Sequence, residues 1–138
     1  MRNNQRSSIA YSLLTLVLLF AGFNANAEIG GELTQELNGV SLVYEYTSGR
    51  KYTVQYSEKT FAYLRMDEPG REWISGVPYI ARKIDDNLYL VNWHRPERVE
   101  YVTILIDLDK QILYTSALLE GTDRHFDLAN IVSLTRNN

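Results

Sequence analysis

Two alternating runs of side chains on either side of a Ser48-Gly49 turn constrain the fold more than any other feature of the sequence. Every second residue on both sides of the turn falls on one face: Val40, Leu42, Tyr44 and Tyr46, then Tyr52, Val54 and Tyr56. Successive side chains of a β-strand point to opposite faces, and a glycine in a short connection permits a tight turn. The stretch therefore predicts a β-hairpin whose inner face is rich in tyrosine.

The tyrosines of this inner face have two interpretations. A phenol ring is apolar, but its hydroxyl needs a hydrogen-bond partner once it is buried, so a face with several phenols suits a ligand cavity better than a dry core. Tyrosine is also favoured in strands by β-propensity alone, and ordinary structural tyrosines give the same pattern. The hairpin by itself leaves both interpretations open.

Short strands and turn signals continue at regular intervals through the rest of the chain. Strands are expected at residues 60–66, 71–74, 76–84, 88–95, 101–107, 111–118 and 127–135, after a lead-in at 28–38 without a strand pattern. Pro78 places its strand at an edge or a bend, because proline cannot donate a ladder hydrogen bond. About eight short strands without a long helix predict an all-β domain, either an antiparallel barrel or a sandwich.

Residues 1–27 have the three parts of a secretory signal peptide. Arg2 and Arg6 precede an apolar run from residue 10 to residue 22, and Ala25-Asn26-Ala27 forms an A-x-A cleavage site. The run is shorter than the roughly 20 residues of a membrane-spanning helix, so we expect no stable membrane insertion after cleavage; an uncleaved anchor is the alternative. A periplasmic or secreted protein with one domain at residues 28–138 is expected.

The mature part, 111 of the 138 residues, is acidic and lacks cysteine. It has twelve basic and seventeen acidic residues, a net charge of −5, because the signal peptide contains two of the arginines. Nucleic acid is therefore not an expected partner, and the domain must fold without disulfides. His94 and His125 are the only histidines and lack metal-ligand spacing, so neither a metal nor another cofactor is expected.

An ordered set of aromatic and glycine positions resembles a known family. The set consists of Tyr44-Glu45-Tyr46, Ser48-Gly49, Tyr52, Tyr63, Gly70-Arg71-Glu72-Trp73, Leu88-Tyr89, Asn92-Trp93 and Pro96. Its order and spacing resemble the phenolic acid decarboxylases and their MoaF-like relatives, over about residues 43–118. The resemblance implies a single small antiparallel β-barrel of the lipocalin-like (calycin) type.

The resemblance also implies which residues would act in an enzyme. Tyr44 and Tyr46 match the tyrosine pair that holds the substrate carboxylate in the decarboxylases. Arg71 matches the family's arginine, with Glu72 as one additional residue in that motif. The family's glutamate, two residues after the strand tryptophan, is replaced by Arg95. An arginine stays charged and cannot exchange a proton, so decarboxylation is expected to be absent or very weak.

Strand alternation sends Arg95 to the same inner face as Trp93. A buried cation needs a partner. One interpretation is structural: an internal salt bridge, for instance to Glu72 or Asp107, or a side chain that reaches water at the barrel rim. The other is functional, with Arg95 and Arg71 pairing with a carboxylate of a ligand.

The sequence thus favours an exported barrel that binds a small apolar or aromatic ligand without catalysis. An anionic ligand is expected if Arg95 has no internal acidic partner. The predicted ligand-binding residues are Tyr44, Tyr46, Tyr52, Tyr63, Arg71, Tyr89, Trp93 and Arg95. Two alternatives stay open: a decarboxylase-like lyase or isomerase that uses Tyr44, Tyr46 and Arg71, and a barrel whose outer face binds an exported protein.

Cleavage after Ala27 tests the export prediction. N-terminal sequencing of the protein from the extracytoplasmic fraction of its own cells is expected to find Glu28 first, because signal peptidase cuts after an A-x-A site. Finding Met1 on that protein would show that the segment is an uncleaved anchor.

Overall fold

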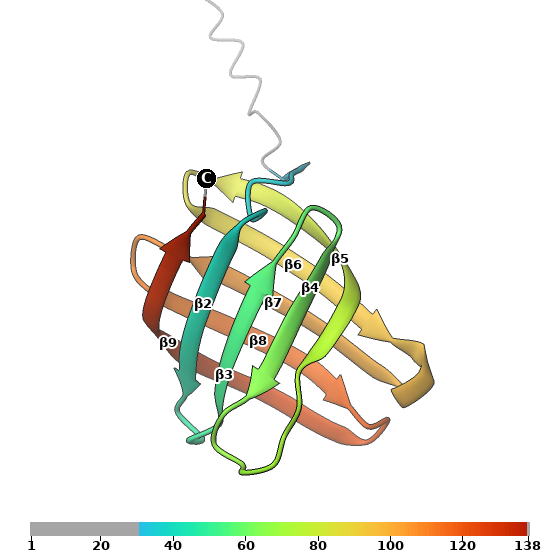
Figure 1. Ribbon diagram of the computed structural model, residues 1–138. Helices are drawn as coiled ribbons and strands as arrows, with labels where there is room; N and C mark the ends of the chain where they lie inside the picture. The colour runs from blue at the N-terminus through green and yellow to red at the C-terminus, as the bar shows by residue number, and fades with distance from the viewer. Residues whose placement is uncertain (1–30, 138) are drawn as a thin grey trace, which may run out of the picture.

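The computed structural model describes residues 31–137, which form a closed antiparallel β-barrel of eight strands with one short extra strand (Figure 1). The predicted barrel is confirmed and the sandwich is excluded. The strands are β1 (Glu32–Leu33), β2 (Val40–Tyr46), β3 (Lys51–Tyr56), β4 (Thr60–Arg65), β5 (Ile74–Asp85), β6 (Leu88–Arg95), β7 (Glu100–Asp107), β8 (Ile112–Leu119) and β9 (Asp123–Arg136). The predicted signal peptide lies outside the described residues.

The strands follow one another around the barrel as a meander. Each strand from β2 to β8 pairs antiparallel with the next one in the sequence, and β9 pairs with β2 to close the ring. The predicted hairpin is present, with Tyr44 opposite Tyr52 across β2 and β3. The only helix among the described residues is the 3₁₀ turn η1 (Pro96–Arg98), so no helix there is long and apolar enough to cross a membrane.

Strand β5 turns a corner of the barrel between β4 and β6. Its first half pairs with β4, where Thr60 lies opposite Pro78, and its second half pairs with β6 from Tyr79 onward. Pro78 thus lies at the bend that the sequence indicated, where the ladder changes partner. The two predicted strands at 71–74 and 76–84 are one strand that begins at Ile74, and the expected strand at Arg71–Trp73 is absent. The expected break at Ser75 is absent, because the strand continues through Ser75 and Gly76.

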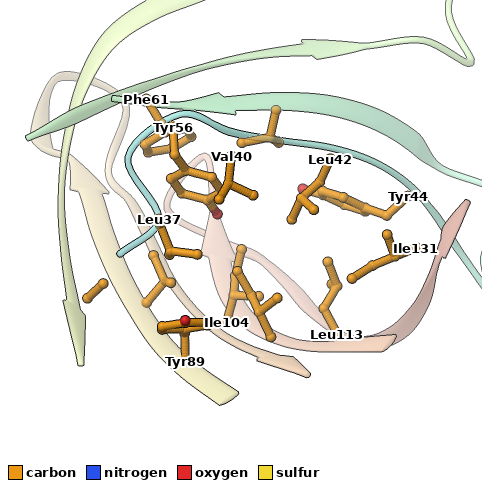
Figure 2. Close-up of a cluster of buried hydrophobic side chains, with 14 of the residues drawn as sticks. Leu37, Val40, Leu42, Tyr44, Tyr56, Phe61, Tyr89, Ile104, Leu113 and Ile131 are labelled. Carbon is orange, nitrogen blue, oxygen red and sulfur yellow. The ribbon is translucent and has the colours of Figure 1, made fainter. Parts of the chain in front are cut away.

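One end of the barrel is closed by the segment that links β1 to β2. This segment makes a turn, in which the Val40 N–H donates to the Leu37 carbonyl at 2.9 Å. The Leu37 side chain is fully buried, and Figure 2 shows it entering the cluster of buried side chains from outside the sheet. Beside it, the Tyr89 hydroxyl donates to Glu36 Oε2 at 2.9 Å. The apolar core is therefore concentrated toward this end.

Truncation of Leu37 tests the role of this closing turn. Leu37→Ala is expected to lower the free energy of unfolding by about 2 to 5 kcal/mol, because it leaves a void where a fully buried side chain packs. Leu33→Ala is the matched control, since Leu33 is 67% exposed on β1 and should change stability by less than about 0.5 kcal/mol. Equal effects of the two variants in urea unfolding would show that the turn does not close the core.

Candidate functional site

The other end of the barrel opens into a cavity of about 380 Å³. In Figure 1 the β2–β3 and β4–β5 connections lie at this lower end, away from β1 and the C-terminus. Side chains from all eight barrel strands line the cavity. It is therefore enclosed by the sheet on its sides and by the packed core at its inner end, and the connections between strands surround its mouth.

Aromatic side chains form most of one wall of the cavity. Tyr44 meets Tyr46 edge to face, with ring centroids 5.5 Å apart, and stacks on Tyr52 at 5.8 Å. Tyr63 and Trp93 lie further round the wall, with ring centroids 5.9 Å apart. These contacts hold the rings in place, so the wall is formed before any ligand binds.

The buried phenols are neutral at physiological pH. Burial raises the pKa of Tyr44 well above its ordinary value and raises the pKa of Tyr46 to about 12. The Tyr46 hydroxyl shares a 2.7 Å hydrogen bond with Thr115 Oγ1 across the barrel. These tyrosines therefore provide aromatic surface and hydroxyl groups to the cavity, but no negative charge.

Glu100 is the one buried acidic side chain of the described residues, and it lines this cavity. It begins β7 directly opposite Arg95 of β6 and is 6% exposed. Its Oε2 has no hydrogen-bond partner, and Arg95 Nη1 approaches that oxygen only to 3.6 Å. On its other side Arg98 Nε lies 3.3 Å from Oε1. Glu100 thus brings to the cavity wall a buried acceptor without a hydrogen bond.

The backbone before Glu100 is strained. Val99 has φ 55°, in the left-handed region that a β-branched residue rarely adopts. Its carbonyl accepts the Gly121 N–H at 3.1 Å, which ties the β6–β7 connection to the β8–β9 connection. Such strain persists only where surrounding contacts fix it, and here it sets the position from which Glu100 enters the barrel.

His125 of β9 contributes a second unpartnered polar atom. Its ring lies 4.6 Å from the Tyr46 ring in an edge-to-face contact, and its buried Nε2 has no hydrogen-bond partner. Burial, together with the positive charge of Arg50, lowers the pKa of His125. The imidazole is therefore neutral at pH 7 and offers the cavity either a donor or an acceptor.

Most of the side chains predicted from the sequence do meet at this cavity. Tyr44, Tyr46, Tyr52, Tyr63 and Trp93 all line it. Arg71 reaches it only from the rim, where its side chain is half exposed. Arg71 Nε donates to Glu68 Oε2 at 2.6 Å, so a carboxylate of the β4–β5 connection already binds it.

Two predicted positions, Tyr89 and Arg95, do not line the cavity. Tyr89 points into the barrel but belongs to the closed end, where Glu36 binds its hydroxyl, and it does not line the cavity. The expected face was right, but alternation along a strand gives no information on depth in the barrel.

Arg95 is held by internal partners rather than free to pair with a ligand. Its Nε donates to Glu97 Oε1 at 2.9 Å and its Nη1 donates to the Tyr63 hydroxyl at 3.2 Å, while Glu100 lies behind it. Its acidic partners are thus Glu97 and Glu100, not Glu72 or Asp107 as suggested from the sequence. The condition on which an anionic ligand was expected is therefore not met.

Glu100 and His125 were not among the predicted site residues. Glu100 lies two residues before Val102 and four before Ile104, so the same period-two alternation that sends these two inward also predicts an inward Glu100. His125 was missed because β9 begins at Asp123, before the expected start at residue 127. His94 does lie outside as expected, stacked on Tyr101 with ring centroids 5.9 Å apart.

Comparison with known proteins identifies the fold but no family. No family model and no curated protein matches the sequence. Among solved structures, one from Burkholderia vietnamiensis described as a "putative beta-lactamase" matches with a TM-score of 0.61. The match covers 73% of this chain and 95% of that one, at 18% identity. At this identity the likeness shows a shared fold alone.

A carboxylate at the mouth predicts acid sensitivity. Asp127 accepts hydrogen bonds from the Thr47 hydroxyl and, at 3.2 Å, from the Ser48 N–H, which ties the β2–β3 turn to β9. Partial burial opposes the charge, but these bonds prevail and hold the pKa of Asp127 at about 2, against an ordinary 3.8. Since the folded-state pKa is depressed, this stabilisation is present above about pH 4 and is lost as the pH falls toward 2.

Asp127→Asn is expected to cost about 1 to 2 kcal/mol at pH 7 and to flatten the loss of stability between about pH 4 and 2. Urea unfolding across this range measures both effects. Glu58→Gln, at an exposed site of the β3–β4 turn, is the control and should leave the pH profile unchanged. An Asp127→Asn profile as steep as that of the wild type would contradict the assignment.

Proposed function

We propose that this barrel binds a small aromatic molecule in the cavity at its open end and that it does so as an exported protein. The observation that carries the proposal is the cavity itself, about 380 Å³ in volume and walled by packed tyrosine and tryptophan rings. Ligand sites in proteins are typically concave, mostly apolar, roughly 300 to 1,000 Å³ in volume and largely formed in advance. This cavity is concave and of that volume, and it combines a preformed aromatic wall with charged side chains near its mouth.

Two polar groups of the cavity wall support a specific ligand rather than a nonspecific apolar one. Glu100 Oε2 and His125 Nε2 are buried atoms without hydrogen-bond partners. A buried polar atom in this state costs about 1 to 3 kcal/mol, and a ligand that pairs with it recovers that cost. Both atoms belong to residues that line the cavity.

Catalysis in the same cavity is the second candidate, favoured by one observation. Glu100 lines the cavity together with Tyr44 and Tyr46, so the barrel does contain a carboxylate near the tyrosine pair that resembles the decarboxylases. The lining residues include neither serine nor lysine. The "beta-lactamase" description of the structural neighbour therefore gains no support from a serine nucleophile here.

The third candidate, a protein-binding barrel, draws on the outer face. Leu90, Leu105, Tyr114 and Leu128 are neighbours in one cross-strand row on β6 to β9, and Tyr114 is 48% exposed. An exposed apolar row of this kind occurs at protein interfaces. The interior, however, is hollow, whereas a barrel used only for its outer surface needs no cavity.

Filling the cavity tests the proposed function. Ala117 and Ser116 are neighbours on β8, and only Ala117 lines the cavity. Ala117→Trp is expected to weaken binding of the uncharged fluorescent probe N-phenyl-1-naphthylamine by at least about tenfold, since the indole occupies the space that the ligand needs. Ser116→Trp, whose side chain faces solvent, is the matched control and should bind the probe like the wild type.

Equal binding by all three proteins would place the probe outside the cavity and refute the proposal. Native mass spectrometry of the protein from its own cells provides the complementary measurement. A retained molecule supports binding, and its conversion into a product of different mass during incubation would favour the catalytic candidate.

A further inference from the structure

We propose that the cavity selects aromatic molecules that carry a positive charge, such as an aryl-alkyl ammonium ion, and that Glu100 is the residue that recognises the charge. The inference rests on the proposed function, because the molecule must first enter the cavity. It reverses the expectation of an anionic ligand drawn from Arg95.

The first support is the unused bonding capacity of Glu100. Its side chain is more than nine-tenths buried, it lines the cavity, and its Oε2 has no hydrogen-bond partner. A carboxylate only accepts hydrogen bonds when ionised, so the group it lacks is an N–H or O–H donor. Charge-assisted hydrogen bonds are roughly twice as strong as neutral ones, so an ammonium group is preferred over a hydroxyl.

The second support is the charge balance around Glu100. Ion pairs link Glu100 to Arg95 and Arg98, and these link in turn to Glu97 and Glu120. Two guanidinium groups thus face three carboxylates, and the linked group has one excess negative charge. Each arginine has a carboxylate partner besides Glu100, so an incoming anion would meet engaged cations and a buried carboxylate oxygen without a hydrogen bond.

The remaining arginines of the cavity mouth are also paired. Arg50 lies 3.5 Å from Asp123, Arg65 lies 2.9 Å from Asp67, and Arg71 pairs with Glu68. The mouth therefore presents no unneutralised cluster of cations that would repel a positively charged ligand.

The third support is the aromatic wall. The face of a tyrosine or tryptophan ring attracts a cation through its quadrupole, by roughly 0.5 to 2 kcal/mol depending on desolvation. Tyr63 lies at the junction of the wall and the charged group, since its ring lies 5.9 Å from that of Trp93 and its hydroxyl accepts from Arg95. A cation bound beside Glu100 would thus lie in the same cavity as these rings.

Three probes of matched shape test the inference by displacement of N-phenyl-1-naphthylamine: the cation of 2-phenylethylamine, neutral 2-phenylethanol and anionic 3-phenylpropanoate. The wild-type protein should bind the amine at least about tenfold more tightly than the alcohol, and the carboxylate most weakly of all. Glu100→Gln should bring the affinity for the amine down to that for the alcohol while leaving the affinity for the alcohol within about threefold. Retained dye binding by Glu100→Gln shows that the barrel is still folded.

Glu58→Gln is the control, because Glu58 is an exposed carboxylate that neither lines the cavity nor belongs to the linked group. It should keep the preference for the amine. The inference is overturned if the carboxylate binds as tightly as the amine, if Glu100→Gln keeps the preference, or if none of the three probes displaces the dye.

In each of these cases dye binding by the wild type still supports the proposed function, whereas a failure of the dye itself to bind in the cavity refutes that function. Should Glu100→Gln fail to fold, the order of the three wild-type affinities decides the inference.

Discussion

The pairing of β2 with β9 is the contact on which the rest of the structure depends, because without it the strands would form an open sheet with two unpaired edges. A bulge in β9 makes this closure compatible with the core. Leu42 lies opposite Leu134 and Tyr44 opposite Ile131, so the extra residue resets the alternation of β9 and keeps both of its apolar side chains inward. Closure thus places Tyr44 and Tyr46 inside the barrel.

The two ends of the barrel use this enclosure differently. At one end Leu37 plugs the interior and the side chains pack as a core. At the other end the connections between strands supply charged side chains, and a cavity remains. A buried polar atom without a hydrogen bond destabilises a packed core, but beside a cavity a polar ligand can supply the missing bond. The positions of Glu100 and His125 at the open end follow this rule. The ligand-binding candidate and the catalytic candidate both centre there for this reason.

The sequence allowed the strand pattern and much of the aromatic wall to be predicted. Residues 88–95 form the strand that alternation indicated, and five of the predicted tyrosine and tryptophan positions line the cavity. Strand alternation did not predict correctly whether a side chain lines the cavity where residues outside the strand fill the barrel interior. Tyr89 and Trp93 share a face, yet only Trp93 lines the cavity, because the Leu37 turn fills the barrel beside Tyr89. The alternation could not reveal that turn, since the lead-in segment has no period of its own.

The sequence by itself determined that the chain is all-β and which strand faces are apolar, because alternation with a period of two is a local property of neighbouring residues. Only the tertiary structure decided which charges meet. Arg95 and Glu100 are separated by the η1 turn, and the β6–β7 register brings them face to face in the barrel. Register fixes such cross-strand neighbours over the whole ladder, and it depends on the shape of the connection and on the closure of the ring. The same arginine that looked like a receptor for anions is, in the folded barrel, already bound to carboxylates.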